Sequence, residues 1–306
     1  MTPADRLVLG TWGLGGIHRT GLGPASYGHV SWDEFNQVCN EAAAAGIGWF
    51  DVAPGYGNGE SMRRLARWLG DTHRRPKIGI KLGRPYEAGR PVSRVAADDI
   101  SKEFEAATAL LGFAPDAIMI KDPPTALLHS RDLHAFLKTV AVRLNADAMG
   151  IATHNLDVTD LPQTTGGILQ IEYNGIQWHR ALPSLREAKL RGWIIWGMQP
   201  LAYGFLATRN ATDPFSDDDL RSRFSESVKV GLCAMSNGFH KSFEEYSGFS
   251  RAERALAFCL CSPSVDRVVI GPRSVPQLRS SLRALTLATY PEFRNAVQRQ
   301  LGSAEH

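Results

Sequence analysis

The sequence contains few cysteines and no long apolar run. Its four cysteines are Cys39, Cys233, Cys259 and Cys261, and no pair has CxxC spacing. We interpret them as reduced core thiols, which excludes a disulfide-stapled secreted protein and a cysteine zinc site. No segment approaches the ~18 consecutive apolar residues that a membrane-spanning helix needs. The N-terminus lacks the basic start and apolar run of a signal peptide, so we expect a cytoplasmic protein with no membrane partner.

Motifs for a metal site, a P-loop and a serine nucleophile are also missing. The nine histidines do not pair with cysteines or carboxylates at the spacing of a metal site, and no P-loop or GxSxG motif is present. The net charge is only +3, with Lys and Arg scattered along the chain. That charge is too mild for a nucleic-acid or membrane surface but suits an anionic small molecule. We therefore expect no metal, no nucleic acid and a small-molecule substrate, and the sequence leaves the oligomeric state open.

Short apolar runs rich in β-branched residues recur along the chain, separated by segments with helical periodicity. The runs are 7–12, 47–52, 78–82, 117–121, 149–153, 169–173, 194–198 and 267–271. Each run is continuous rather than alternating, as expected for a parallel strand covered on both faces. A capping box at Ser31–Glu34 opens the first helical segment, whereas the segment after Asn155 is short and only weakly helical.

This alternation predicts an α/β fold, a (β/α)8 TIM barrel with residues 1–306 as a single domain. An open doubly wound sheet is the alternative, but it needs GxGxxG opening a helix after the first strand. The chain has the irregular segment GLGGIHRTGLGPASYG there instead. We expect a long loop or lid at about 205–250, between the seventh and eighth strands, and a C-terminal tail at about 289–306.

Ionisable or amide side chains end nearly every predicted strand. They are Asp51, Lys81, Lys121, Asp122, His154, Asn155, Glu172, Asn174, Gln199 and Arg273. In a barrel these ends converge on one face, where active sites lie. An ion pair that only closes the barrel end is the alternative interpretation of Asp51 and Lys81. Tyr56, between glycines in the loop after the second strand, favours a site, because a nearby ammonium lowers a phenol's pKa from ~10.

The motifs around these residues resemble those of the aldo-keto reductases. The segment from Phe50 to Ser61 looks like that family's Asp-to-Tyr signature, and Lys77–Arg84 looks like its lysine strand. Leu169–Asn174 and Val269–Ser274 match in register further along, so the resemblance covers residues 7 to about 288. The branch to which the chain is most similar contains sugar and pyridoxal dehydrogenases. The resemblance implies the same barrel and an NAD(P)(H)-dependent oxidoreductase acting on a carbonyl or alcohol.

Carried over by position, the resemblance implies that Tyr56 is the general acid–base, with Lys81 and Asp51 lowering its pKa. It implies that Gln170 hydrogen-bonds the nicotinamide carboxamide, with Asn155 as a neighbouring contact. The remaining positions implied for cofactor binding are Thr11, Trp12, Met198, Leu201, Gly204, Gly271, Arg273, Ser274 and Gln277. Of these, Leu201 and Gly204 would cradle the pyrophosphate. Arg273 and Ser274 would meet the adenosine 2′-phosphate, which favours NADP over NAD.

The chain departs from the family pattern at several positions, of which Lys121 is the most informative. It replaces the usual fourth-strand histidine, which helps to polarise the substrate carbonyl. Met198 stands where a stacking tyrosine is usual, Ala152 where a serine is expected, and Ser280 and Ser281 where an acid and an amide contact adenine. Lys121 has four interpretations: it polarises a carbonyl, binds a substrate carboxylate or phosphate, forms a Schiff base, or makes only a structural contact with Asp122.

The sequence therefore predicts NADP(H)-dependent hydride transfer to or from a carbonyl, alcohol or imine carbon of a polar small molecule. Two alternatives stay open. One is a Schiff-base lyase or epimerase that uses Lys121, and the other is a catalytically weak NADP(H)-binding sensor or interaction subunit. His18, His154 and Trp178 are predicted to border the substrate pocket. Substrate identity depends on the loops at about 13–31, 84–92, 122–130 and 205–250, whose composition does not encode a ligand.

Overall fold

The predicted barrel is present and closed. The computed structural model describes residues 2–87, 90–128, 132–144, 148–156, 158, 161, 163–164, 166–207, 210 and 214–302, so parts of the loops at 84–92, 122–130 and 205–250 lie outside it. The parallel barrel strands follow the order β1-β12-β11-β10-β9-β8-β5-β4 around the ring. They are β1 (Leu7–Gly10), β4 (Trp49–Val52), β5 (Lys77–Leu82), β8 (Ala117–Lys121), β9 (Ala148–Thr153), β10 (Ile168–Glu172), β11 (Ile194–Met198) and β12 (Arg267–Ile270).

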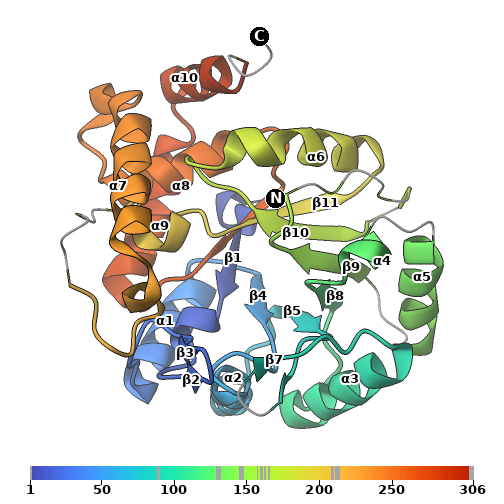
Figure 1. Ribbon diagram of the computed structural model, residues 1–306. Coiled ribbons are helices and arrows are strands. Elements are labelled where there is room, and N and C mark those ends of the chain that lie inside the picture. Colours follow the sequence, from blue (N-terminus) through green and yellow to red (C-terminus); the bar gives the residue numbers. More distant parts are fainter. Residues whose placement is uncertain are drawn as a thin grey trace.

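Helices surround the barrel on the outside (Figure 1). They are α1 (Trp32–Ala44), α2 (Glu60–Thr72), α3 (Ala97–Leu111), α4 (Thr125–Leu128), α5 (Asp132–Leu144), α6 (Trp178–Leu190), α7 (Glu226–Lys241), α8 (Arg251–Cys261), α9 (Val275–Leu287) and α10 (Pro291–Gly302). The described residues between β9 and β10 contain no helix, in keeping with the weak helical pattern there. None of the helices within the described ranges has the length and apolar character needed to cross a bilayer.

Side chains fill the barrel rather than leaving a pore. Its interior cluster consists of Val8, Ala117, Met119, Ala152, Ile168, Trp196, Met198 and Val269. Two glycines make this packing possible, one by leaving space for the large Trp196 ring and the other by letting two strands approach closely. A Cβ on Gly79 would lie 3.1 Å from the Trp196 ring, and a Cβ on Gly150 would lie 2.0 Å from the Ile168 carbonyl oxygen. Small residues at these positions therefore allow the strands to close around a packed core.

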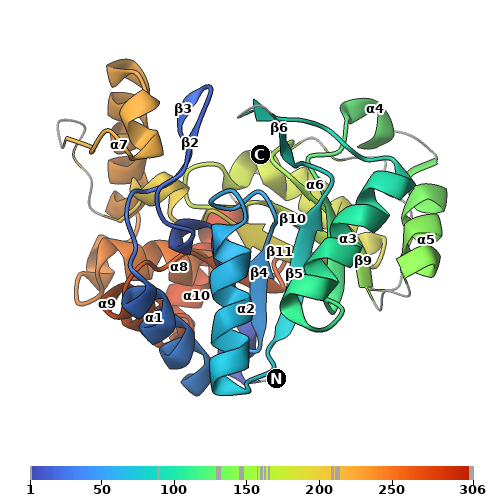
Figure 2. The same cartoon turned by 90° about the horizontal axis from the view of Figure 1, so that it is seen from below.

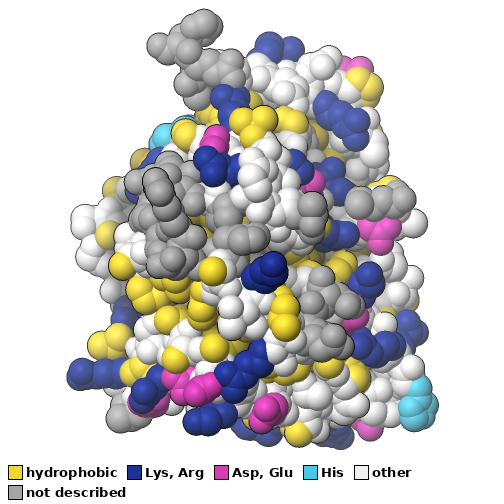
Figure 3. Space-filling model, turned by 90° about the vertical axis from the view of Figure 1, so that its right-hand side faces the viewer, with side chains coloured by type: hydrophobic (Ala, Val, Ile, Leu, Met, Phe, Trp, Pro, Cys, Tyr) yellow, Lys and Arg dark blue, Asp and Glu magenta, His cyan; other side chains and the backbone are white. Residues whose placement is uncertain are grey.

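The carboxyl ends of the strands carry the irregular elements. The hairpins β2–β3 (Arg19–Thr20 and Gly23–Pro24) and β6–β7 (Tyr86–Glu87 and Arg90–Pro91) stand on one end of the barrel with α4 and α7 (Figure 2). The N-terminus lies at the other end. On the face shown in Figure 3, Lys and Arg side chains are spread over the surface rather than gathered into one patch. The loops thus surround the end of the barrel where the polar strand ends meet.

The connection expected as a loop at about 205–250 contains helix α7. Ser225 caps this helix by accepting a hydrogen bond from Val228 N, and Cys233, Ser236, Phe239 and His240 form its buried face. The expected C-terminal tail likewise contains α10, whose Phe293, Val297 and Leu301 are buried. In both segments a buried stripe at helical spacing stabilises the helix.

His240 should make the stability of the fold depend on pH. It is 5% exposed, and its Nε2 donates a hydrogen bond to the Leu206 carbonyl at 2.9 Å. Burial lowers the pKa of His240 to about 4, below the ~6.5 of an unfolded histidine. The unfolded chain therefore binds more protons between these values, and stability falls as the pH falls from about 6.5 towards 4.

We expect this histidine to contribute about 2 kcal/mol to the loss of unfolding free energy between pH 7.5 and 4.5. The measurement is urea unfolding of the wild type and of His240→Gln at both pH values. The variant should lose about 2 kcal/mol less than the wild type over this interval. Equal losses in the two proteins would contradict the assignment.

Candidate active site

A cavity of about 700 Å³ opens at the carboxyl ends of the strands. It is lined by most of the side chains that the sequence predicted for a site: Trp12, Asp51, Tyr56, Lys81, Lys121, His154, Gln170, Met198, Leu201, Gly204, Gly271, Arg273 and Gln277. These residues come from all eight strands or the segments directly after them. Barrel closure brings them together because parallel strands end on the same side.

A buried ion pair lies at the base of the cavity. Lys81 Nζ donates to Asp51 Oδ2 at 2.5 Å, and their side chains are only 3% and 2% exposed. The amide Nε2 of Gln170, on β10, also donates to Asp51, at 3.3 Å to Oδ1. The Lys81 ammonium lies 5.0 Å from the centre of the Tyr56 ring. A carboxylate, an ammonium and a phenol therefore share one small volume.

Backbone hydrogen bonds fix the loop that carries Tyr56. Tyr56 N donates to Ala53 O at 3.0 Å, and Tyr56 O accepts from the backbone N–H of Ser61 at 3.3 Å. Gly57 has a φ of +58°, and a Cβ there would lie 2.4 Å from the Gly15 carbonyl oxygen. Glycine is therefore required for the loop to turn against the segment after β1.

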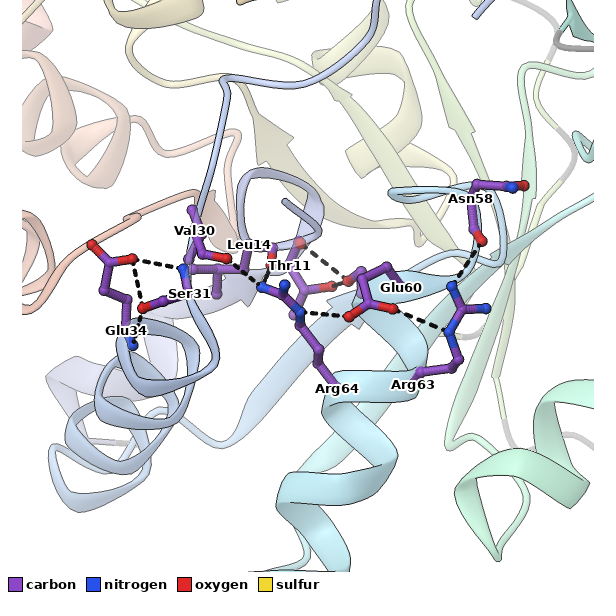
Figure 4. Close-up of polar contacts among 10 residues, drawn as sticks. Thr11, Leu14, Val30, Ser31, Glu34, Asn58, Glu60, Arg63 and Arg64 are labelled. Atoms are coloured by element: carbon purple, nitrogen blue, oxygen red, sulfur yellow. Dashed lines mark hydrogen bonds and ion pairs between the residues drawn. The ribbon is translucent and has the colours of Figure 1, made fainter. Parts of the chain in front are cut away.

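Arg63 and Arg64 of α2 form hydrogen bonds and ion pairs that hold this loop in position (Figure 4). Arg64 Nη1 donates to the carbonyls of Leu14 at 3.1 Å and Val30 at 2.8 Å, and its Nε pairs with Glu60 at 2.8 Å. Arg63 pairs with the same Glu60 at 3.1 Å and donates to Asn58 O at 3.3 Å. These contacts join the loop after β4 to the long segment after β1, which stabilises the position of Tyr56.

The pKa of Tyr56 is shifted in the direction opposite to our expectation. Burial raises it well above the usual value, Asp51 raises it further, and Lys121 opposes these effects. The predicted lowering of the Tyr56 pKa is therefore wrong for this structure. The physical reason is that Lys81 is already paired with Asp51, so desolvation of the phenolate dominates. The Tyr56 side chain is only partly exposed, and it lines the cavity. The phenol is protonated at neutral pH and suits a proton donor.

Asp122 organises the mouth of the cavity. It follows β8 with a φ of +41°, and its N–H donates to Ala152 O at 2.7 Å. Its Oδ1 accepts from His154 N at 3.1 Å and contacts His154 Nδ1 at 3.0 Å. Burial opposes its ionisation, but the hydrogen bonds from His154 and the charge of Lys121 outweigh burial and hold the pKa of Asp122 well below its usual range. The carboxylate therefore stays charged and orients the His154 ring.

The other side of the cavity contains Arg273, in the segment after β12. Its N–H donates to Gln277 Oε1 at 2.8 Å and its Nη2 donates to His29 O at 2.9 Å, while its Nε is buried with no partner among the described residues. Leu201 and Gly204 line the cavity after β11, and Gly204 has a φ of +88°. An arginine donor that no described residue uses and the backbone around Gly204 thus line the side of the cavity formed by β11 and β12.

Several predicted site residues do not line this cavity. Thr11 is fully buried behind it, where its hydroxyl donates to Asp51 O at 2.9 Å and accepts from Ser61 Oγ at 2.7 Å. Asn155 and Ser274 are not among the described lining residues either. Ser274 begins helix α9 as its N-cap.

Trp178 and His18, which were predicted to border the substrate pocket, do not line this cavity either. Trp178 is the first residue of α6 and packs in the core, with its ring centre 6.3 Å from that of Phe258. His18 lines a separate cavity of about 530 Å³ with Arg19, Asn58 and Arg63. The Tyr86 ring, 4.9 Å from that of His18, borders both cavities. Helix α6 thus carries Trp178 into the core, and His18 faces the neighbouring cavity.

Sequence reasoning missed several lining residues, namely Tyr27, Tyr86, Tyr203 and Arg221. Tyr27 forms a β-bridge with Asp219, and Leu220 N donates to Ser26 O at 2.8 Å. Arg221 pairs with Asp219 at 2.5 Å and donates to Tyr203 O at 3.1 Å. These contacts join two loops that are far apart in sequence, and no local pattern encodes such pairing.

Fold and site together define a barrel enzyme with its polar residues at the carboxyl ends of the strands. Residues 6–299 match the family model described as the Aldo/keto reductase family. The chain belongs to this family and is an oxidoreductase. No curated protein matches the sequence significantly.

Two solved structures show the same fold. The glycerol dehydrogenase AKR11B4 from Gluconobacter oxydans is 22% identical, with a TM-score of 0.73, over 98% of this chain and 92% of that one. The aldo-keto reductase AKR11C1 from Bacillus halodurans is 15% identical, with a TM-score of 0.67, over 96% of this chain and 91% of that one.

Proposed function

We propose that this protein is an NADP(H)-dependent oxidoreductase that moves a hydride to or from a carbonyl or alcohol carbon of a polar small molecule. The observation that carries the proposal is the shared cavity of Tyr56, the Asp51–Lys81 pair and Gln170. Membership of the aldo/keto reductase family supports the reaction class. When bound, the nicotinamide cofactor supplies or accepts the hydride, and the protein supplies binding, orientation and the proton.

The residues of the cavity fit a nicotinamide dinucleotide. Gln170 Oε1 is buried without a hydrogen-bond partner among the described residues, so an amide donor of the carboxamide would satisfy it. Arg273 Nε, which is buried and likewise has no partner within the described ranges, suits the 2′-phosphate, because a guanidinium donates bidentately to phosphate. Leu201 and Gly204 line the part of the wall that would face the pyrophosphate, and Met198 replaces a stacking ring with a thioether.

Tyr56 would give its phenolic proton to the carbonyl oxygen during reduction and take it back during oxidation. Its raised pKa keeps the proton on the phenol at neutral pH, which favours the reductive direction. Asp51 holds Lys81 beneath the ring, and Gln170 orients Asp51. Lys121, with its ammonium 3.5 Å from Asp122, would hold the reacting oxygen or an anionic group of the substrate beside Tyr56. This ion pair disfavours a Schiff base, which needs a neutral amine.

Cofactor binding gives the first test. We expect NADPH to bind more tightly than NADH, and Arg273→Gln to weaken NADPH binding by about 10- to 100-fold, the loss of a charge-assisted hydrogen bond. The measurement is fluorescence titration with both nucleotides. Arg279→Gln is the matched control, because Arg279 lies on helix α9, which begins just after Arg273, and pairs with Glu41 at the surface. Equal binding of the two nucleotides by the wild type would contradict the NADP preference.

Turnover gives the second test. NADPH consumption is measured with a panel of polar aldehydes, and borohydride trapping is run in parallel. Consumption without a covalent adduct supports the proposal. An adduct on Lys121 would instead establish the Schiff-base enzyme. Tight NADPH binding with no consumption on any aldehyde would favour a sensor.

A further inference from the structure

Two cations at the mouth of the cavity have hydrogen-bond donors that no described residue uses. Arg84, which follows β5, and Lys121, which ends β8, both line the cavity, with side chains 35% and 21% exposed. Within the described residues the ion-pair partner of each is Asp122, at 3.7 Å from Arg84 and 3.5 Å from Lys121. Both distances exceed the ~2.9 Å of a good N–H···O hydrogen bond. With no closer acceptor in the described part of the chain, their donors can bind a ligand.

Of the other cations of the cavity, two are bound to acidic partners and the third lies on the opposite side. Lys81 is 2.5 Å from Asp51, and Arg221 donates to both Asp219 and Tyr203 O. Arg273 donates to His29 O and lies on the β12 side. In the ring of strands, β12 and β8 are four positions apart, which is opposite in an eight-stranded barrel. A phosphate of the dinucleotide near Arg273 is therefore separate from an anion at Lys121.

The acids at the mouth do not neutralise the two cations. Asp122 carries one negative charge, and its hydrogen bonds come from His154 rather than from Arg84 or Lys121. Glu103 also lines the cavity, but its carboxylate accepts from Gly83 N at 2.8 Å and forms no ion pair with either cation in the described structure. Two full positive charges thus share one carboxylate, and the remaining positive charge attracts an anion.

These cations line the same cavity as the reacting group. Lys121 and Asp122 both act on the pKa of Tyr56. The Arg84 carbonyl and the Tyr86 ring pack against Gly55, the residue directly before Tyr56. An anion held by Arg84 and Lys121 would therefore occupy the same cavity as a carbonyl that receives the Tyr56 proton.

We propose that the substrate is a small carbonyl or alcohol compound carrying a carboxylate or phosphate group, and that Arg84 and Lys121 bind this oxyanion. The proposal rests on the proposed function and names the substrate class for the same site. Asp122 is the positioning residue, because it holds both cations near the cavity and is itself fixed by Ala152 and His154.

The test compares matched charged and neutral aldehydes with NADPH as the reductant. The probes are 4-oxobutanoate against butanal, and glyceraldehyde 3-phosphate against glyceraldehyde. We expect kcat/KM to be at least about tenfold higher for the charged member of one pair, as for one charge-assisted hydrogen bond. The pair with the larger ratio identifies carboxylate or phosphate. Raising the ionic strength should lower the ratio, since salt screens charges beyond a Debye length of ~10 Å at 0.1 M.

Arg84→Gln and Lys121→Gln should each lower the charged-to-neutral ratio by about tenfold. Arg67→Gln is the matched control, because Arg67 is 60% exposed on α2, pairs with Asp71 and lies outside the cavity; its ratio should equal that of the wild type. If Lys121→Gln lowers kcat equally for both members of a pair, Lys121 polarises the carbonyl and the anion site is wrong. Equal Tyr56-dependent reduction of all four probes overturns the anion site alone. Failure to reduce any of them overturns the proposed function, and the anion site with it.

Discussion

Tyr56→Phe is expected to lower kcat for aldehyde reduction by about 10²- to 10⁴-fold, the usual contribution of a positioned general acid. The variant keeps the ring and the backbone bonds of Tyr56 to Ala53 and Ser61. NADPH affinity and thermal stability should therefore stay close to those of the wild type. The measurements are steady-state kinetics, nucleotide titration and thermal unfolding of the same preparation.

Tyr86→Phe provides the comparison, because Tyr86 also presents a phenol to the cavity. Its replacement should cost less than tenfold in kcat, as expected for a hydroxyl that does not transfer the proton. If Tyr56→Phe retains more than a tenth of wild-type kcat, another group donates the proton. The raised pKa of Tyr56 adds a pH signature: the acid stays protonated as the pH rises, so reduction should not decline between neutral and mildly alkaline pH.

Lys81→Met is expected to abolish activity and to destabilise the fold by about 3–5 kcal/mol, the cost of leaving one member of a buried ion pair without its partner. Asp51 would remain 2% exposed, with Gln170 Nε2 as its remaining side-chain donor among the described residues. For a chain of this length the loss corresponds to a decrease of about 5–8 °C in Tm. Thermal unfolding at neutral pH measures it.

The double variant Asp51→Asn/Lys81→Met separates stability from chemistry. Removing both charges should recover most of the lost stability, because no unpaired charge stays buried. Activity should remain absent, since the ammonium beneath the Tyr56 ring is still missing. A single Lys81→Met variant as stable as the wild type would show that the pair is not the buried, mutually dependent contact described above.

The barrel could be predicted because each strand is a continuous apolar run, as in LQIEY and IIWGM. Closure then determines which residues meet, so Asp51, Lys81 and Lys121 could be assigned to one site from their positions at strand ends alone. Helix α7 was harder to detect. Gly231 and Gly238 lie in its interior, and its buried face mixes Cys233 and Ser236 with aromatic residues, which weakens the hydrophobic periodicity.

Loop residues could not be placed in the same way. Tyr27 reaches the cavity through its bridge to Asp219, a tertiary pairing that neither segment encodes locally. Trp178 follows the sixth strand closely in sequence, yet it begins α6 and turns into the core against Phe258. The direction of the Tyr56 pKa shift also required the structure, because it depends on how fully Asp51 already neutralises Lys81.

Deuterium transfer tests the central claim most directly. Wild-type protein is incubated with a reducible aldehyde and NADPH deuterated at C4, using each of the two C4 isomers in turn, and the alcohol product is examined by mass spectrometry. We predict that one isomer places a single deuterium on the former carbonyl carbon, and that Tyr56→Phe slows its appearance by about 10²-fold or more. Alcohol formed without deuterium from either isomer, or no alcohol at all while the nucleotide binds, would contradict hydride transfer in this cavity.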